Sequence, residues 1–361
     1  MSSPLDVADL RQRVQDCLDS ELAHQRTVLE PLGPDVVELV DSVERLISGG
    51  KRLRAAFLYW GYRGAGRPDS PEAVRLASAM EFFQAAALLH DDVMDDSDTR
   101  RGLPAAHRAL ASAHGRRGWE GDPERFGLSG AVLAGNLCLG WTDELYATSG
   151  LPAEDLARGR GVLHLMRTQL MAGQYLDVVE SVRPWSALTA AERVARAERV
   201  IHYKSAKYSI EHPLLIGARA GGLGEEDVQA LSAYGLALGH AFQLRDDLLG
   251  VFGDPATTGK PAGDDLREGK RTVLVAHTLA GANAPEAALL EARLGDPDLD
   301  AHGVEELRAV IRGSGAVDLV EGEIATLAAS AREHLKAATG VTEEAAAVLE
   351  ELVAVTTARQ A

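Results

Sequence analysis

The fold is decided by MEFFQAAALLHDDVMDDSD, residues Met80–Asp98. This stretch is apolar on nearly every side of a helix and then ends in acidic residues. A helix that is apolar all round belongs inside a bundle, surrounded by other helices. A second stretch, Tyr234–Asp254 (YGLALGHAFQLRDDLLGVFGD), has the same design. We therefore expect two central helices whose terminal carboxylates face a central cavity.

The rest of the chain indicates an all-α fold. Aromatic residues make up only 5% of the sequence, and the long segments carry apolar residues at three- and four-residue spacing, which favours helices. Glycine and proline mark the expected helix breaks at 64–68, 115–130, 150–152, 221–224 and 253–263. We expect a single domain, residues 1–361, with a motif-bearing core at 46–272 and C-terminal helices at 286–361 packed on the outside.

Composition excludes several functions. The net charge of −17 argues against a nucleic-acid partner, because phosphate backbones would be repelled. A small phosphorylated substrate would need a patch of Lys and Arg, or bound cations that reverse the sign of an acidic site. Two cysteines support neither a disulfide framework nor structural zinc. No apolar run reaches the roughly 18 residues of a membrane span, and the polar N-terminus is unlike a signal peptide, so we expect a cytoplasmic protein.

The acidic end of the first central helix is a candidate metal site. Asp91 and Asp95 are four residues apart and share a helical face, with Asp92 beside them, so their like charges repel. Two readings compete: a solvated acidic helix end, or ligation of a hard cation such as Mg²⁺ by carboxylate oxygens. The buried run before the acids and Arg100 and Arg101 after them favour the metal.

The second central helix repeats this arrangement. Asp246 and Asp247 end it, and Gln243 lies one turn earlier. A lone Asp-Asp pair is usually surface decoration and a lone Gln is usually a satisfied polar group. Two such pairs, each closing an unusually apolar helix, favour a functional interpretation.

Basic residues complete the set. Lys51 and Arg54 follow Gly49 and Gly50, which allow close approach of the backbone to a ligand. This pattern suits a diphosphate, although alone it would be an ordinary basic helix start. Lys204, Lys260 and Lys270 carry no information individually, because a single Lys is nearly always solvated.

In this order, the motifs resemble the trans-isoprenyl diphosphate synthase (polyprenyl synthetase) family, and bacterial geranylgeranyl diphosphate synthases in particular. The resemblance covers Leu46–Thr272. It implies an all-α isoprenoid-synthase bundle with a central active-site cavity. It also implies Mg²⁺-dependent condensation of isopentenyl diphosphate with an allylic diphosphate, which could be dimethylallyl, geranyl or farnesyl diphosphate. Family members are commonly homodimers.

The resemblance also implies residue roles. About three Mg²⁺ ions would be held by the acids of the two motifs, with Asp246 as ligand of the third ion: Asp91, Asp92, Asp95, Asp246 and Asp247. Isopentenyl diphosphate would be bound by Lys51, Arg54, Gln84 and Arg101. The allylic diphosphate would be bound by Arg100, Lys204, Lys260 and Lys270. Oxygens directed towards the developing carbocation would come from Gln174, Ser205 and Gln243.

The sequence departs from the commonest family pattern at several positions. Ala55 follows Arg54 where Pro is usual, and Asn136 replaces the Asp of a Gly-Asp pair. Gln84 stands where many members have His, and Ser205 where many have Thr. Gly250 stands where the second motif often has its third Asp. Only Gly250 bears directly on metal binding, because it removes a carboxylate that would support the ligands.

Helix geometry suggests the product length. Phe83, Ala87 and Asp91 lie at four-residue steps, so Phe83 lies ~12 Å below Asp91 along the helix. The small Ala86 and Ala87 disfavour a stop at farnesyl length, and a layer of Phe82 and Phe83 would close a longer pocket. We expect geranylgeranyl diphosphate (C20), with farnesyl (C15) and geranylfarnesyl (C25) diphosphate as alternatives. Plain core packing is the other explanation of both Phe residues.

Two other functions share these features. A class I terpene cyclase also carries a DDxxD motif, but its second motif needs a Ser at the position of Gly250 and a Glu at that of Asp254. A cyclase would also have no use for the second diphosphate pocket of Lys51, Arg54 and Arg101. A noncatalytic subunit of a heteromeric synthase could lose its aspartates, whereas here both clusters are present.

Overall fold

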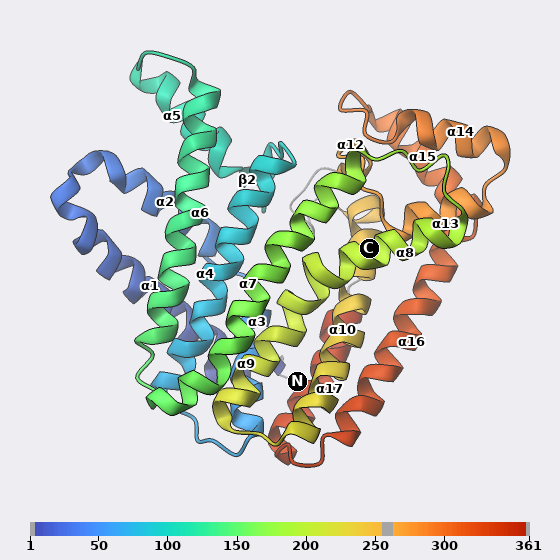
Figure 1. The fold of residues 1–361 in the computed structure, drawn as a ribbon. Helices are drawn as coiled ribbons and strands as arrows, with labels where there is room; N and C mark the ends of the chain where they lie inside the picture. Colours follow the sequence, from blue (N-terminus) through green and yellow to red (C-terminus); the bar gives the residue numbers. More distant parts are fainter. Residues whose placement is uncertain (1–3, 255–262, 359–361) are drawn as a thin grey trace. The chain divides into compact units, whose positions relative to one another are not determined.

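The computed structural model describes residues 4–254 and 263–358, which are almost entirely helical (Figure 1). The all-α prediction is confirmed. Within these ranges the strands are confined to one short hairpin, β1 (Thr99–Arg100) with β2 (Leu103–Pro104), which the sequence did not predict. Lys260 lies outside the described residues.

The chain forms two compact units, each assembled from separate segments. Unit 1 runs up to Gly161 and adds Pro213–Gly224 and Gly340–Val348. Unit 2 comprises Val162–His212, Glu225–Thr339 and the chain from Leu349 onward. The long helices α7 (Ala153–Val182) and α17 (Glu343–Thr357) contribute to both units. The single domain expected from the sequence stays a prediction.

Unit 1 is built around helix α4 (Pro71–Met94), which packs against α1, α2, α3, α5 and α6. Helix α4 begins where Ser70 caps it, since the Ser70 side chain accepts from the Ala73 N–H and Pro71 suits the first turn. The other elements of this unit are η1 (Pro4–Asp9), α1 (Leu10–Leu29), η2 (Glu30–Leu32), η3 (Pro34–Val36), α2 (Val37–Ile47), α3 (Leu53–Gly64), α5 (Ala106–Arg117), α6 (Pro123–Ala147) and α9 (His212–Gly221).

Unit 2 is built around helix α10 (Glu225–Phe252), which packs against η4, α12, α13 and α16. The two helices expected at the centre of a bundle are thus each at the centre of a unit. The other elements of unit 2 are α8 (Ala190–Val200), the π-helix η4 (Ile201–Glu211), α12 (Asp264–Arg267), α13 (Val273–Gly281), α14 (Ala284–Arg293), α15 (Ala301–Gly313) and α16 (Ala316–Ala337).

One expected helix break is shorter than the sequence suggested. The break at 115–130 covers only the turn between α5 and α6, and Gly127 and Gly130 lie inside α6. The reason is close helix packing, since a side chain at Gly127 would bring its Cβ to 2.1 Å from the His107 carbonyl oxygen. Glycine serves here to let two helices touch rather than to end one.

The C-terminal segment does more than cover the outside of the core. The hydrophobic core of unit 2 includes side chains from α14, α15 and α16, among them Leu290, Leu307 and Val320, which are all fully buried. None of the described helices is long and apolar enough to cross a membrane.

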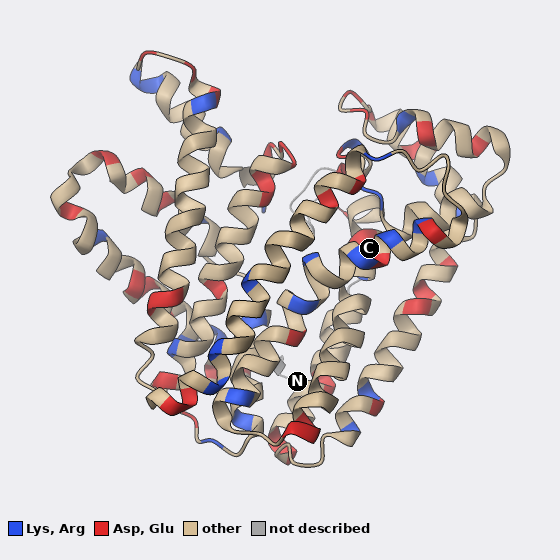
Figure 2. Ribbon diagram, viewed as in Figure 1, with Lys and Arg blue, Asp and Glu red and all other residues tan. Residues whose placement is uncertain are grey.

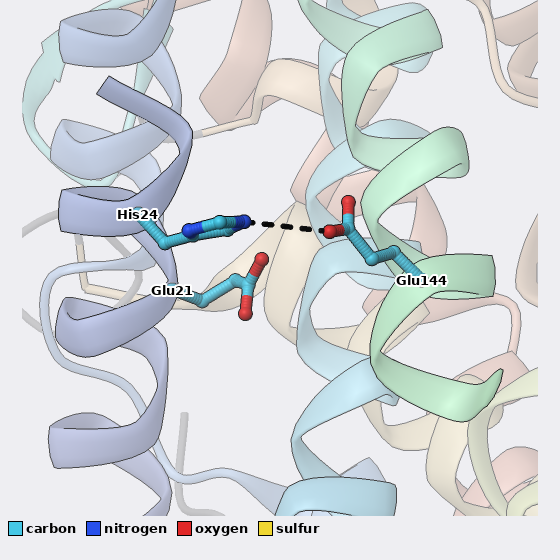
Figure 3. A group of neighbouring side chains, drawn as sticks. All are labelled: Glu21, His24 and Glu144. Carbon is cyan, nitrogen blue, oxygen red and sulfur yellow. Dashed lines mark ion pairs between the residues drawn. The ribbon is translucent and has the colours of Figure 1, made fainter. Parts of the chain in front are cut away.

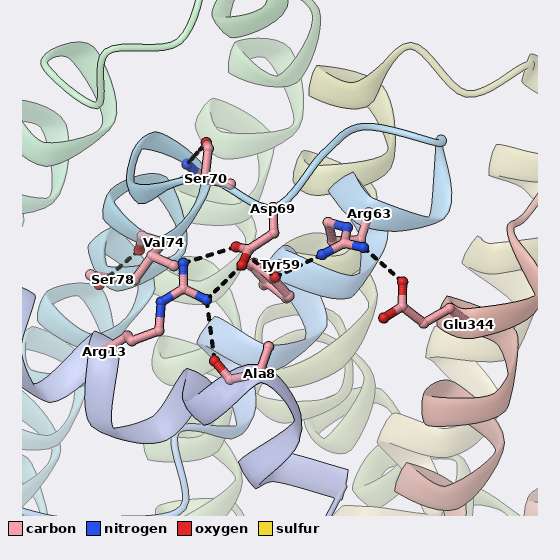
Figure 4. Close-up of polar contacts among 10 residues, drawn as sticks. Ala8, Arg13, Tyr59, Arg63, Asp69, Ser70, Val74, Ser78 and Glu344 are labelled. Carbon is pink, nitrogen blue, oxygen red and sulfur yellow. Dashed lines mark hydrogen bonds and ion pairs between the residues drawn. The ribbon is translucent and has the colours of Figure 1, made fainter.

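A chain of polar side chains crosses unit 1 between α1, α3 and α17 (Figure 4). Arg13 binds Asp69 through both carboxylate oxygens, at 2.8 and 3.0 Å. The Tyr59 hydroxyl donates to Asp69 (2.9 Å) and accepts from Arg63 (3.1 Å), and Arg63 also donates to Glu344 (2.7 Å). Residues far apart in the sequence are thereby joined.

Candidate active site

The first acidic site consists of Asp91, Asp92 and Asp95 at the C-terminal end of α4. Figure 2 shows acidic residues gathered at this end of the helix. Asp95 caps α4, and its N–H donates to the Asp91 carbonyl oxygen (2.8 Å). A helix C-terminus already carries partial negative charge, so carboxylates there are unfavourable unless a cation is near. The predicted DDxxD residues therefore lie together where positive charge is needed.

Arg100 supplies part of that positive charge. It lies in the β1–β2 hairpin that directly follows the acids, and its Nε donates to Asp92 Oδ1 (2.8 Å). Its guanidinium also lies 3.6 Å from Asp91 Oδ2. Asp92 is buried while Asp91 and Asp95 are partly exposed. Asp92 is thus held by Arg100 and is less accessible than Asp91 and Asp95.

The Gly49–Arg54 loop is held in place by a buried ion pair. Arg52 has a left-handed backbone (φ 54°), and its guanidinium lies 3.1 Å from Glu81 Oε2 on α4. Both side chains are less than 10% exposed. Arg52 also donates to the Ile47 carbonyl oxygen and to Gln15. Lys51 next to it is exposed, and Arg54 lies partly buried in the first turn of α3.

Arg101 lies against the same loop. Its guanidinium donates to the carbonyl oxygens of Leu46 (2.7 Å) and Gly49 (3.4 Å), and it would lie 3.3 Å from a Cβ at Gly50. Burial lowers the pKa of Arg101, and the nearby guanidinium groups of Arg52, Arg100 and Arg54 lower it further, against the opposing effect of Glu81.

Several arginines therefore gather at one place in unit 1. An anion there would relieve their mutual repulsion, and guanidinium groups match the geometry of phosphate oxygens. Three of the four residues predicted to bind isopentenyl diphosphate, Lys51, Arg54 and Arg101, belong to this loop or lie against it.

Helix α4 presents one partly exposed face that leads to Asp91. Gln84, Ala87, Leu88 and Asp91 are partly exposed, at the spacing of one helix face. Ala85, Ala86 and Leu89, on the other sides of the helix, are buried, and so is Phe83, one turn before Ala87.

The predicted chain-length residues divide between this face and the core. Ala87 lies on the partly exposed face, whereas Ala86, Phe82 and Phe83 are at most 1% exposed. The Phe82 ring packs edge-on against Trp141, with 5.5 Å between the ring centroids. Phe82 therefore packs into the core, and Phe83 is the aromatic residue in line with Ala87 and Asp91.

The second acidic site lies in unit 2 near the C-terminal end of α10, which continues past both acids to Phe252. Asp246 is partly exposed and Asp247 is buried. Gln243 Nε2 donates to Asp247 Oδ1 (2.8 Å), so the predicted Gln243 and Asp247 are joined. Burial raises the pKa of Asp247 to about 8, with Gln243 opposing the rise and the Asp265 and Asp246 carboxylates adding to it.

Asp265 is a member of this site that the sequence reading missed. It lies in α12, and Lys270 Nζ is 3.4 Å from its Oδ1. Lys270 also lies 2.5 Å from Glu268 Oε2. The predicted Lys270 therefore lies beside the second acidic site. Only the contact of Asp265 with Gly250, which the sequence does not show, would have identified this residue.

Lys204 and Ser205 lie on the π-helix η4, a rare conformation that is often found at functional sites. Lys204 Nζ donates to Asp177 Oδ2 on α7, three residues after Gln174. Helix α7 approaches closely because residue 173 is glycine: a Cβ there would lie 2.4 Å from the Tyr203 carbonyl carbon and 2.5 Å from Lys204 N. Ser205 and Gln174 are both buried. The sequence reading missed Asp177, although its spacing from Gln174 places both on one face of α7.

Another acidic group in unit 1 has a structural explanation. Glu21, His24 and Glu144 offer ligand atoms within 4.8 Å of one another (Figure 3). However, Gln25 donates to Glu21 Oε1 and to Glu144 Oε2, each at 2.8 Å, and Arg75 donates to Glu21 Oε2 (3.0 Å). The buried Glu21 carboxylate is thus satisfied by protein groups, and this cluster ties α1 to α6.

The two acidic sites fit Mg²⁺ by the chemistry of their donors. Both offer carboxylate oxygens, which are the ligands that this hard cation prefers, and among the described residues assigned to the two sites there is no thiol or imidazole. In the second site burial is the main cause of the raised pKa of Asp247, and repulsion from the Asp265 and Asp246 carboxylates raises it further. A divalent cation would remove that repulsion.

Central helices that end in carboxylates, with arginines gathered at one of them, define an enzyme suited to metal-dependent chemistry on diphosphates. The polyprenyl synthetase family model matches residues 36–311, and the chain belongs to this family. It is therefore an all-α trans-prenyltransferase, an isoprenyl diphosphate synthase, and its activity depends on metal.

The chain is also similar to individual prenyl diphosphate synthases. The chain is 31% identical to a geranylfarnesyl diphosphate synthase of Aeropyrum pernix, over 85% of this chain and 90% of that one. It is 30% identical to a geranylgeranyl diphosphate synthase of Sulfolobus acidocaldarius, over 73% of each chain. A crystal structure of geranylgeranyl pyrophosphate synthase from Corynebacterium glutamicum, complexed with isoprenyl diphosphate and magnesium, is 38% identical with a TM-score of 0.91. That match covers 97% of this chain and 99% of the other.

Proposed function

We propose that this enzyme condenses isopentenyl diphosphate with an allylic diphosphate to form geranylgeranyl diphosphate. The observation that carries the product length is the alignment on α4 of Asp91, the partly exposed Ala87 and the buried Phe83 at four-residue steps. The similarity to the Corynebacterium glutamicum geranylgeranyl pyrophosphate synthase supports C20. The similarity to the Aeropyrum pernix geranylfarnesyl diphosphate synthase keeps C25 as the main alternative, with C15 as the other.

Both acidic sites would hold the metal ions that accompany the allylic diphosphate, about three Mg²⁺ in all. Asp91 and Asp95 would be ligands, with Asp92 kept in place by Arg100, and Asp246 would be a ligand with Asp247 beside it. Bound Mg²⁺ would stabilise the negative charge that develops on the leaving pyrophosphate.

The basic loop of unit 1 would hold isopentenyl diphosphate. Lys51, Arg54 and Arg101 carry the charge, and Gln84 lies on the accessible face of α4. These residues would position the double bond of isopentenyl diphosphate next to the allylic carbon. A nucleophile held in this way reacts as if it were present at very high concentration.

The remaining predicted residues would act on the allylic substrate. Arg100, Lys204, Lys260 and Lys270 would bind its diphosphate. Gln174, Ser205 and Gln243 would turn oxygens towards the allylic cation. The Gln243 amide nitrogen donates to Asp247, an orientation that directs its amide oxygen away from that carboxylate. The departing pyrophosphate would take up the proton released in the final step, so no protein base is required.

The enzyme would act as a cytoplasmic homodimer. Helix α7 supports an interface, because Met171, Tyr175, Val178 and Val182 form an exposed apolar stripe, with Tyr175 69% and Val182 78% exposed. Such stripes are typical of surfaces that another protein covers. The molecular mass in solution, measured by sedimentation, should correspond to two chains.

One assay tests the reaction and the product. The purified protein is incubated with Mg²⁺, isopentenyl diphosphate and, in turn, dimethylallyl, geranyl and farnesyl diphosphates, and the products are sized by mass spectrometry. We expect C20 diphosphate from each starter. A cyclised product lacking diphosphate would indicate a terpene cyclase, and no product from any starter would indicate a noncatalytic subunit. A C25 or C15 product would replace the chain-length proposal only.

A further inference from the structure

The second aspartate motif lacks its third acid, but that position faces the other two. Gly250 follows Asp246 by four residues and Asp247 by three, all on helix α10. Residues at this spacing lie on the same side of a helix. A carboxylate at position 250 would therefore stand beside Asp246, and glycine leaves this place without a side chain of its own.

The place is nevertheless occupied by a carboxylate. A Cβ at Gly250 would lie 1.9 Å from Asp265 Oδ2, 2.4 Å from its Cγ and 3.0 Å from its Oδ1. The carboxyl group of Asp265 thus fills the volume in which a side chain at position 250 would begin. Any residue other than glycine would displace it.

Asp265 is held there by the structure around α12. The helix starts after Gly263, which has a left-handed backbone (φ 73°), and Leu266 is buried in the core of unit 2. The Gly295 N–H donates to the Leu266 carbonyl oxygen (2.8 Å), and the Lys270 N–H donates to the Asp265 carbonyl oxygen (3.0 Å). The side chain is therefore presented from an anchored turn.

The two oxygens of Asp265 have different neighbours. Oδ1 lies 3.4 Å from Lys270 Nζ, while Oδ2 is the atom that approaches Gly250 most closely. The end of α10 thus carries three acids, two from the motif and one from α12.

We propose that Asp265 replaces the missing third carboxylate of the second aspartate motif, and that Gly250 is a positioning residue that admits it. The inference rests on the proposed function, since Asp265 would support the Mg²⁺ held at Asp246. Loss of a carboxylate that supports metal ligands typically costs 10- to 100-fold in metal affinity. The competing explanation is that Asp265 serves only as the ion-pair partner of Lys270.

The first test measures metal binding directly. Binding of Mn²⁺ in the presence of inorganic pyrophosphate is followed by electron paramagnetic resonance for the full-length protein. Asp265→Asn keeps the size of the side chain and removes its charge, so we expect Mn²⁺ affinity to fall about tenfold or more. Asp298→Asn, an exposed acid of the same unit, is the matched control and should bind as wild type does.

The second test exchanges the two residues. Gly250→Asp alone restores the family pattern but collides with Asp265, so it should weaken Mn²⁺ binding. In Gly250→Asp with Asp265→Ala the collision is removed and the site keeps three acids, at positions 246, 247 and 250, so binding should recover to within a few-fold of wild type. Circular dichroism establishes that each variant is folded. Asp265→Ala alone is the comparison: it should bind Mn²⁺ weakly and gain affinity when Gly250→Asp is added, whereas it would bind as tightly as wild type if Asp265 served only Lys270.

The outcomes separate this inference from the proposed function. Wild-type Mn²⁺ affinity in Asp265→Asn, or Gly250→Asp binding as tightly as wild type, would overturn the role of Asp265 and Gly250 alone. If wild-type protein bound no Mn²⁺ with pyrophosphate and formed no prenyl diphosphate, both proposals would fail together.

Discussion

The carboxylates of Asp91 and Asp95 at the end of α4 repel each other, and this arrangement is unfavourable without a nearby cation. Asp91 shares its face with Asp95, at a helix end that is itself negative, and Arg100 is directed mainly to Asp92. Such a cluster is tolerated because it serves binding rather than stability. The effect of removing one acid should therefore appear in catalysis and not in folding.

Asp91→Ala should lower turnover by roughly 10²–10³-fold, the usual effect of removing one group that stabilises transition-state charge. The free energy of unfolding should stay unchanged or rise slightly, because a repulsion is relieved. Steady-state kinetics at saturating Mg²⁺ and thermal unfolding measure the two effects, with Asp298→Ala as control. Near-normal turnover in Asp91→Ala would remove this residue from the metal site.

The ion pair between Arg52 and Glu81 holds the Gly49–Arg54 loop against helix α4. Arg52→Met leaves Glu81 charged and buried, so it should cost about 3–5 kcal/mol in the free energy of unfolding. The double variant Arg52→Met with Glu81→Gln should cost less than Arg52→Met alone. Denaturant unfolding checks this.

A kinetic readout separates anchoring from general stability. If the pair positions the loop, the folded double variant should have a raised KM for isopentenyl diphosphate and an unchanged KM for the allylic substrate. Equal changes in both constants would mean that the pair stabilises the fold without positioning the loop.

At the scale of elements, the π-helix η4 depends on glycines in its neighbours. Gly173 on α7 admits the backbone at Lys204, and Gly239 on α10 admits Ala206, whose Cα would lie 2.6 Å from a Cβ at position 239. The backbone that carries Lys204 and Ser205 is thus fitted between two helices without side chains at the contact points.

Gly173→Ala should therefore displace Lys204 and reduce kcat/KM for the allylic substrate at least tenfold. Gly161→Ala in the same helix is the control, because its Cβ would meet nothing within 4 Å. That control should keep activity and gain up to about 1 kcal/mol of stability from the better helix propensity of alanine. Equal kcat/KM in both variants would argue against the positioning of Lys204 by this contact.

The partly exposed face of α4 makes a prediction about product size. Ala87→Phe places a ring one turn below Asp91 and should shorten the main product to C15. Phe83→Ala removes the ring next in line and should lengthen the product to C25 or beyond. Mass spectrometry of the product diphosphates reads both changes. Phe82 packs on Trp141, so Phe82→Leu should change stability and not product length.

For the whole molecule, acid stability should be limited by three histidines of unit 2, of which His212 is buried and His202 and His240 are partly buried. Burial lowers the pKa of His240 to about 4 and that of His212 to about 3, and the pKa of His202 is also lowered. Below pH about 6.5 the unfolded chain binds protons that the folded protein does not. The free energy of unfolding should therefore fall as the pH drops from 6.5 towards 4.

His240→Leu should reduce this loss of stability, by roughly 1–3 kcal/mol at pH 4. Denaturant titrations at pH 7, 5.5 and 4 measure the dependence. His240 would be discounted as a source of the acid sensitivity if the variant kept the same pH slope as wild type.

Much of this architecture could be predicted from the sequence because it follows from local patterns. The all-round apolar runs ending in Asp91 and Asp246 correctly indicated two central helices, and the order of motifs indicated the family. Asp265 could not be predicted, because its contact with Gly250 arises only when the chain returns after α10. The same holds for Arg52 and Glu81, whose pairing depends on how α3 meets α4.

The series of polar side chains in Figure 4 has a consequence for folding during synthesis. Arg63 and Glu344 are 281 residues apart, and the Thr342 N–H donates to the carbonyl oxygen of Gly64, at the end of α3 (3.0 Å). Unit 1 therefore includes a segment that is synthesised long after α3. Domains usually fold from the N-terminus during synthesis, but here the end of α3 is covered only once α17, 281 residues further along, has been made. Contacts of such large sequence separation also slow folding, so we expect the apolar surface of unit 1 to need protection until α17 has left the ribosome.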